Sequence, residues 1–137
     1  MTMNHASLYP STFYRVSLKA VIRDDRGRVL VNKEGDCNTW CLPGGGWDHG
    51  EVEHEAIARE LFEEVGYQGD FTAKPFATAV FWLESKSAYL LWIIYDVKTK
   101  NTNFSVGEDS TEIAFINPKD LSPDSQSFEE QWIRTNL

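Results

Sequence analysis

The sequence predicts an α+β fold, with one mixed sheet that carries helices on its faces. Short segments with alternating polar and apolar residues recur along the chain, as in strands that bury one face. One longer segment, Val52–Val65, repeats its apolar residues every three to four positions, as an amphipathic helix does. No internal repeat and no second linker divides the chain, so these elements are expected to share one core.

The first half of the chain predicts a hairpin followed by a glycine-rich loop. Tyr14–Arg23 and Arg28–Lys33 alternate as strands do, and Asp24-Asp25-Arg26-Gly27 between them is typical of a tight turn. Trp40–Leu42 is a short predicted strand that stops at Pro43. The run Gly44-Gly45-Gly46 then predicts a loop whose backbone can approach a ligand closely.

The clearest helix follows this loop. In Val52–Val65 the apolar residues Ile57, Leu61 and Val65 recur at a spacing of four, and Gly66 stands where a left-handed C-terminal cap belongs. The remaining predicted elements are four strands and a short helix that begins at a Ser127 capping box: Phe71–Phe76, Ala77–Leu83, Tyr89–Val97, Glu112–Ile116 and the helix through Trp132 to Thr135.

Composition limits the classes of partner. The chain has 137 residues, 42% hydrophobic and 25% charged, which suits one globular domain rather than a disordered chain. Its net charge of −8 argues against a nucleic-acid duplex as partner. An acidic protein would repel a polyphosphate unless a divalent cation lay between them. The alternative is that the charge only keeps the protein in solution.

The ends and the cysteines predict a simple organisation. Residues 1–12 are expected to form a loose N-terminal arm, and residues 13–137 a single domain. The start of the chain lacks the basic and apolar regions of a signal peptide, and the longest apolar stretch, Ala88–Val97, is too short to cross a membrane. A cytoplasmic location follows by default, with Cys37 and Cys41 as free thiols.

Three glutamates predict a metal site. At about 100° per residue, Glu60, Glu63 and Glu64 fall on one face of the predicted helix. Like charges at this spacing destabilise a helix by a few tenths of a kcal/mol, a cost that a hard cation such as Mg²⁺ would relieve. The alternative is a solvated acidic face in which Arg59 pairs with Glu63.

The context of these glutamates resembles a known family. Gly45, Glu51 and the run Arg59-Glu60-Leu61-Phe62-Glu63-Glu64-Val65-Gly66-Tyr67 match the Nudix box, G-x5-E-x7-R-E-U-x-E-E-x-G-U, in every charged position and both glycines. The one departure is Tyr67, an aromatic residue in the last aliphatic position. The resemblance implies a Nudix-type α/β/α sandwich, with the box helix packed on a mixed central sheet, and a pyrophosphohydrolase activity.

The resemblance also implies roles for single residues. Glu60 and Glu64 would be the main ligands of Mg²⁺, or of Mn²⁺ in its place, with Glu63 for a further ion and a carbonyl of Gly44 or Gly45 in the shell. The residues themselves suggest that Arg59 orients a carboxylate. Glu51 either supports the site or merely caps the helix, and the backbone at Gly45 and Gly46 is expected to face substrate.

The general base stays open between a box glutamate, among Glu51, Glu63 and Glu64, and an acid on the later loop. That loop offers Glu112, at the start of a strand, and Glu108 and Asp109 on a stretch expected to be more mobile. The alternative is a merely solvated acidic loop.

Other candidates lie outside the box. Lys33 and Arg23 end strands and are candidates for contact with a phosphate, against the alternative of solvated basic ends. Trp40 and Trp82 either stack on a base or pack in the core.

These observations predict metal-dependent hydrolysis of a phosphoanhydride bond in a nucleoside diphosphate-linked small molecule. The absence of G-x4-G-K-[ST] excludes a P-loop NTPase. A non-catalytic nucleotide-binding module on the same fold is the main alternative, although such a module would typically have lost box carboxylates. Sequence motifs that mark other substrates are missing, which favours a nucleoside triphosphate, and the oligomeric state stays open, a homodimer included.

Overall fold

The computed structural model describes residues 13–137, so the predicted arm at 1–12 lies outside the described residues. Six strands and two α-helices follow one another, with short 3-10 turns at Glu84–Lys86 and Pro118–Asp120: β1 (Tyr14–Val21), β2 (Val29–Lys33), β3 (Gly44–Gly46), α1 (Glu53–Val65), β4 (Phe71–Leu83), β5 (Ala88–Thr99), β6 (Glu112–Ile116) and α2 (Phe128–Asn136). The turn between β1 and β2, the box helix and the final helix are present, with ends within about two residues of expectation. The predicted hairpin is formed only in part, because β1 and β2 join different sheets and pair through the isolated bridge between Arg23 and Val29.

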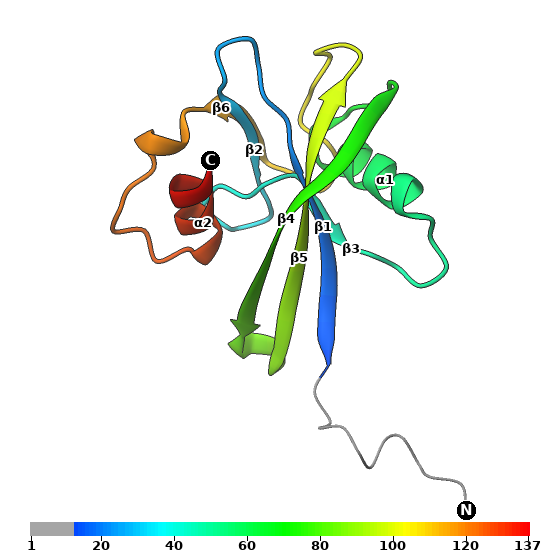
Figure 1. Cartoon of the computed structure of the whole chain (residues 1–137). Coiled ribbons are helices and arrows are strands. Elements are labelled where there is room, and N and C mark those ends of the chain that lie inside the picture. The colour runs from blue at the N-terminus through cyan, green and yellow to red at the C-terminus, as the bar shows by residue number, and fades with distance from the viewer. Residues whose placement is uncertain (1–12) are drawn as a thin grey trace, which may run out of the picture.

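The strands form a four-stranded sheet and a two-stranded ribbon. The larger sheet has the order β3-β1-β5-β4, in which β1 runs parallel to β5 and the other neighbours are antiparallel. The ribbon pairs β2 with β6 antiparallel. Figure 1 shows α1 and α2 on opposite sides of the strands. The predicted α+β fold class, an α/β/α sandwich with a mixed sheet, is therefore confirmed.

Two apolar clusters hold the layers together. On the α1 side, the helix buries Ile57, Leu61 and Val65 against residues of β1 and β5, among them Leu18 and Tyr95. On the α2 side, Ile133 of the helix packs with buried residues of several strands: Val21, Val29, Val31, Trp92 and Ile94. Burying one Leu or Ile side chain stabilises the fold by about 1.5–3 kcal/mol, so these clusters fix both helices on the sheet.

Two predicted boundaries were wrong. The strands predicted at Phe71–Phe76 and Ala77–Leu83 are one 13-residue strand, β4, with an irregularity in its pairing between Pro75 and Ala77. A bulge of this kind shifts the alternation of side chains by one residue, which makes one strand look like two.

The glycine run, predicted as a loop, is instead the strand β3, while the predicted strand Trp40–Leu42 makes only an isolated bridge from Cys41 to Asn32. The absence of side chains lets the glycines pair closely with β1: a Cβ at Gly44 would lie 1.9 Å from the Leu18 carbonyl oxygen. Local propensity opposes a Gly-Gly-Gly strand, so its pairing partner decides the conformation.

Two further findings concern the whole described chain. Within residues 13–137, none of the helices combines the length and the apolar character needed to cross a lipid bilayer. Cys37 is exposed and Cys41 half-buried, and both are free thiols, as predicted.

Candidate functional site

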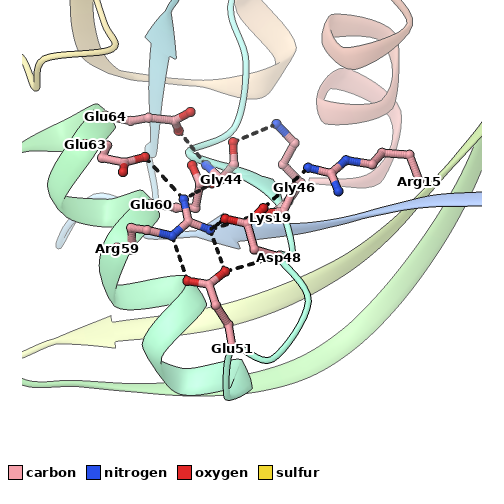
Figure 2. Close-up of polar contacts among 10 residues, drawn as sticks. All are labelled: Arg15, Lys19, Gly44, Gly46, Asp48, Glu51, Arg59, Glu60, Glu63 and Glu64. Atoms are coloured by element: carbon pink, nitrogen blue, oxygen red, sulfur yellow. Dashed lines mark hydrogen bonds and ion pairs between the residues drawn. The ribbon is translucent and has the colours of Figure 1, made fainter. Parts of the chain in front are cut away.

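The site is built where the edge strand β3 meets the box helix. Gly44 pairs with Lys19 of β1, and the peptide groups on both sides of its Cα are held by side chains. The Gly44 amide donates to Oε2 of Glu64 at 2.5 Å, and the Lys19 ammonium donates to the Gly44 carbonyl oxygen at 3.4 Å. Figure 2 shows the glutamates of α1 beside this glycine strand, with Arg59 among them.

Two box carboxylates are buried. Glu60 is 8% exposed and Glu64 4% exposed, so the alternative of a solvated acidic face does not describe them. Burial raises the pKa of Glu64 to about 10, and the nearby Glu34 carboxyl raises it further, against the opposing effects of Lys19 and the Gly44 amide. Burial also raises the pKa of Glu60, although Arg59 opposes this. Water solvates these carboxylates poorly, so a cation at this place would stabilise both.

Arg59 organises the other carboxylates. Its guanidinium donates to both oxygens of Glu51, at 2.7 and 2.8 Å, and to Glu60 at 2.8 Å. It also donates to Glu63 at 3.3 Å and to the Gly46 carbonyl at 3.2 Å. A planar fork with five donors suits this geometry, whereas the point charge of a lysine does not.

Glu51 belongs to this network and does not cap the helix. Residue Val52 occupies the N-cap position of α1 and provides no side-chain cap, while Glu51 accepts hydrogen bonds from Arg59 and from the Asp48 amide. The Arg59 hydrogen bonds lower the pKa of Glu51 to about 2, so this carboxylate is ionised at neutral pH. Glu51 therefore anchors the arginine that orients Glu60 and Glu63.

The later loop caps the end of the box helix. The amides of Gly107 and Asp109 donate to the carbonyls of Glu64 and Glu63, at 3.1 and 2.8 Å. A Cβ at Gly107 would lie 2.2 Å from the Glu63 carbonyl oxygen, so only glycine allows this approach. The stretch expected to be mobile around Glu108 is thus hydrogen bonded to α1, and it holds the last turn from which two box glutamates project.

The strand ends at Lys33 and Glu112 lie side by side. They are register partners in the β2–β6 ribbon, and their side chains form an ion pair at 3.4 Å. The Glu112 side chain is 55% exposed, and the Lys33 ammonium lies 4.3 Å from the centre of the Trp40 ring. These contacts place the two residues together, with Lys33 engaged by Glu112 and Trp40. Trp82 is exposed near the far end of β4, in an edge contact with Tyr89.

Sequence reasoning missed two cations beside the glycine strand. The Lys19 side chain is buried against β3, and the Arg15 guanidinium lies where a Cβ of Gly46 would clash with it. Arg15, Ser17 and Lys19 alternate along β1 and so share one face of the sheet. That alternation was a usable signal, because charged residues on the inner part of a predicted strand need a partner.

The donor set fits a hard divalent cation. Carboxylate and backbone carbonyl oxygens are the ligands that such ions prefer, and Glu60, Glu64 and the glycine strand bring them together. In residues 13–137, however, no three His, Cys, Asp or Glu side chains form a ready metal cluster. Arg59 engages Glu60 and Glu63, and the Gly44 amide engages Glu64, so the carboxylates must turn slightly to share an ion.

Comparisons with known proteins concern the family and the fold of the chain. A sequence model described as the NUDIX domain matches residues 13–135. An RNA pyrophosphohydrolase of Actinobacillus succinogenes is 46% identical over 55 residues, which are 40% of this chain and 28% of that relative, so the match spans little more than a quarter of its length. The nucleoside triphosphatase NudI of Escherichia coli is 29% identical over 117 residues, covering 74% of this chain and 80% of the relative.

Solved structures share the fold. The MutT NUDIX hydrolase from Burkholderia pseudomallei superposes with a TM-score of 0.72 at 20% identity, covering 91% of this chain and 99% of that chain. At this identity the likeness concerns the architecture alone.

Proposed function

We propose, from the premise that this chain belongs to the NUDIX domain family, that it hydrolyses a phosphoanhydride bond in a nucleoside diphosphate-linked small molecule with the help of a divalent cation. Membership confirms the predicted Nudix pyrophosphohydrolase class, in a family that generally uses divalent metals. The choice of Mg²⁺, with Mn²⁺ as a substitute, belongs to the proposal.

One observation carries the proposal: Glu60 and Glu64 are both buried and face the glycine strand, in a chain that keeps every charged residue of the Nudix box. Burying two carboxylates side by side destabilises a protein unless a cation or a proton compensates them. In a non-catalytic relative, nothing would compensate the cost of burying Glu60 and Glu64 beside the Arg59 network.

The residues divide the work. Glu60, Glu64 and a carbonyl of Gly44 or Gly45 would hold Mg²⁺, with Glu63 for a further ion. When bound, such an ion neutralises charge on the diphosphate and makes a bound water a better nucleophile. Arg59 fixes the directions of Glu60 and Glu63, and it is itself fixed by Glu51. At Gly45 a Cβ would lie 2.8 Å from Oε1 of Glu60, so glycine keeps the carboxylate close to the strand.

Phosphate contacts are proposed for the backbone of Gly45 and Gly46 and for Lys33. The glycines lie on the edge strand of the sheet and carry no side chains of their own, so a ligand can approach their backbone beside Arg15 and Glu60. Lys33 would have to exchange its ion pair with Glu112 for the phosphate, and the exposed Glu112 carboxylate can return to water when it does so.

A nucleoside triphosphate is the proposed substrate. Support comes from the relative named nucleoside triphosphatase, which aligns over 74% of this chain, and from the missing motifs for other substrates. The test is a panel of nucleoside triphosphates, nucleotide sugars and dinucleotides, assayed with Mg²⁺ for phosphate or pyrophosphate release. Turnover of none of them, with tight binding of one, would favour the non-catalytic alternative. The cytoplasmic location and the oligomeric state stay predictions.

A divalent cation is expected to stabilise the fold. It would relieve the repulsion between buried carboxylates, and a ligand that binds only the native state at 100 times its Kd adds about 2.7 kcal/mol. Thermal unfolding in millimolar Mg²⁺ should therefore occur at a higher Tm than in EDTA. Glu60→Gln should reduce this shift, whereas Glu55→Gln on an exposed turn of α1 should preserve it. Equal midpoints for the native protein in both solutions would contradict the assigned ligands.

Glu112 is proposed as the acceptor of a proton from the attacking water. It begins a strand, whereas Glu108 lies on a loop whose backbone caps α1. Glu112→Gln is expected to lower kcat roughly 100-fold with little change in Mg²⁺ affinity, and Glu108→Gln to have a smaller effect. Steady-state kinetics across a Mg²⁺ titration measure both. A native kcat in both variants would place the base within the box.

A further inference from the structure

Lys19 is a buried cation for which the box gives no role. It is 6% exposed, at the middle of the sheet on β1. Its ammonium lies 3.3 Å from the Leu42 carbonyl oxygen, 3.4 Å from that of Gly44 and 3.8 Å from Oε2 of Glu129. The face of the Trp92 ring lies beside it, 5.3 Å away. All of its partners are therefore acceptors or a ring face, as a charged amine requires.

This position has an energetic cost. Lysine is almost never fully buried unless it is paired, and an apolar side chain of similar size often stabilises such a place better. Burial by itself would lower the pKa of Lys19, yet the carboxylates of Glu129 and Glu64 raise it above its ordinary value. The three oxygen acceptors and the ring face around the ammonium suit a charged amine, and a buried charge that costs free energy at this place points to a role other than stability.

Glu129 completes the pair from the opposite layer. It lies in the first turn of α2, and its Oε2 atom is buried and makes no hydrogen bond within the described residues. The Lys19 ammonium is the cation that faces this oxygen. The pair therefore links α2, which contributes nothing to the box, to the glycine strand β3.

The link ends at one residue, Gly44, whose two flanking peptide groups are both held. Lys19 donates to the carbonyl of Gly44, and the amide of the same residue donates to Glu64. With φ at 139° and no room for a Cβ, Gly44 has a conformation that its contacts must hold. A carbonyl oxygen has two lone pairs, so the bond from Lys19 occupies one and leaves one directed elsewhere.

We propose that the Lys19–Glu129 ion pair is a positioning device that fixes the backbone of Gly44 through its carbonyl and, through the amide of the same residue, the Glu64 carboxylate. Lys19 and Glu129 act through Gly44 and are not catalytic residues. The consequence for cation binding rests on the proposed function, whereas the consequence for the Gly44 hydrogen bond does not.

The first test uses the metal-free protein. Amide hydrogen exchange at Gly44 reports how often its bond to Glu64 opens. Lys19→Met and Glu129→Gln are expected to raise this exchange rate tenfold or more, while amides of β5 keep their rates. The matched control is Glu130→Gln, because the neighbouring Glu130 is also buried in α2 but binds the Trp40 amide and Ser125. Its Gly44 rate should stay within twofold of the native value.

Two exchange results would overturn the inference. One is an unchanged Gly44 rate in both variants. The other is a rise spread evenly over the sheet, which shows that the pair only stabilises the fold. If Lys19→Met fails to fold, the Gly44 exchange rate in Glu129→Gln alone decides between these outcomes.

The second test measures Mn²⁺ affinity in the same variants. If the two residues acted only through their charges, removing the lysine would strengthen cation binding and removing the glutamate would weaken it. A positioning role predicts weaker Mn²⁺ binding in both variants. The expected loss is about 10–100-fold, which is typical of residues that orient a metal ligand through a hydrogen bond. Opposite signs would overturn the inference. A native protein that binds no Mn²⁺ would instead remove the proposed function, and the exchange rates would still decide the role of the pair.

Discussion

Glu64→Gln is expected to lower kcat by at least about 100-fold while the protein keeps its fold. The glutamine has the same shape, and its carbonyl oxygen still accepts the hydrogen bond from the Gly44 amide. What disappears is the negative charge, which is needed to hold a cation or to take a proton. Because the side chain is 4% exposed and burial raises its pKa to about 10, Glu64 is neutral in the metal-free protein at pH 7, and a neutral amide of the same shape replaces it at little cost. The Tm in EDTA should therefore stay the same or rise.

The control for this variant is Glu55→Gln. Glu55 lies on the same helix, in its exposed first turn, and contributes to no hydrogen bond of the site. It should keep kcat and Tm within measurement error. Measurements of kcat, with the fold followed by circular dichroism, separate the outcomes. Native turnover by Glu64→Gln would remove Glu64 from the active site and with it the proposed ligand set.

Gly44→Ala is expected to give the largest loss of stability. The added Cβ would lie 1.9 Å from the Leu18 carbonyl oxygen and 2.9 Å from the Lys19 Cα, both of them backbone atoms that cannot turn away. The φ of 139° adds strain for any residue other than glycine. Together these effects should cost roughly 3 kcal/mol, which lowers the Tm by roughly 10 °C. Activity should fall with the displacement of β3 from β1.

Gly27→Ala separates clash from backbone strain. Gly27 also has a positive φ, of 77°, but a Cβ there would meet nothing within 4 Å. It stands in the hairpin turn after Asp24, away from the box. We expect a loss of about 1 kcal/mol, from the left-handed conformation alone, and native activity. If Gly44→Ala were no more destabilised than Gly27→Ala, β3 would not be packed against β1 as the structure has it.

The helix and its chemistry could be predicted because both are local. Apolar residues at a spacing of four fix which face of α1 is buried, and Gly66, at φ 64°, ends it as the pattern predicts. The same periodicity places Glu60, Glu63 and Glu64 together, and the family membership agrees. For the same reason, the N-terminal cap at Ser127 was recognisable: its hydroxyl accepts from the Glu130 amide three residues later.

The errors arose where a distant partner decides the conformation. Three glycines have no strand propensity of their own, and they form β3 because β1 offers an edge that only residues without a Cβ can approach this closely. The bulge near Pro75 likewise depends on the pairing of β4 with β5. The loop around Glu108 was expected to be mobile because no local pattern shows that its backbone caps a helix some forty residues earlier.

The sequence by itself thus determined the fold class, the box helix and the residue types of the site, since these follow from periodicity and from a motif within one stretch of chain. Only the tertiary structure decided which carboxylates are buried, that Glu51 anchors Arg59, and that Lys19 and Glu129 meet at Gly44. Burial and charge pairing depend on contacts between residues far apart in the chain, here β1, β3 and α2. Their free energies come from the desolvation that these contacts cause, which no single segment can show.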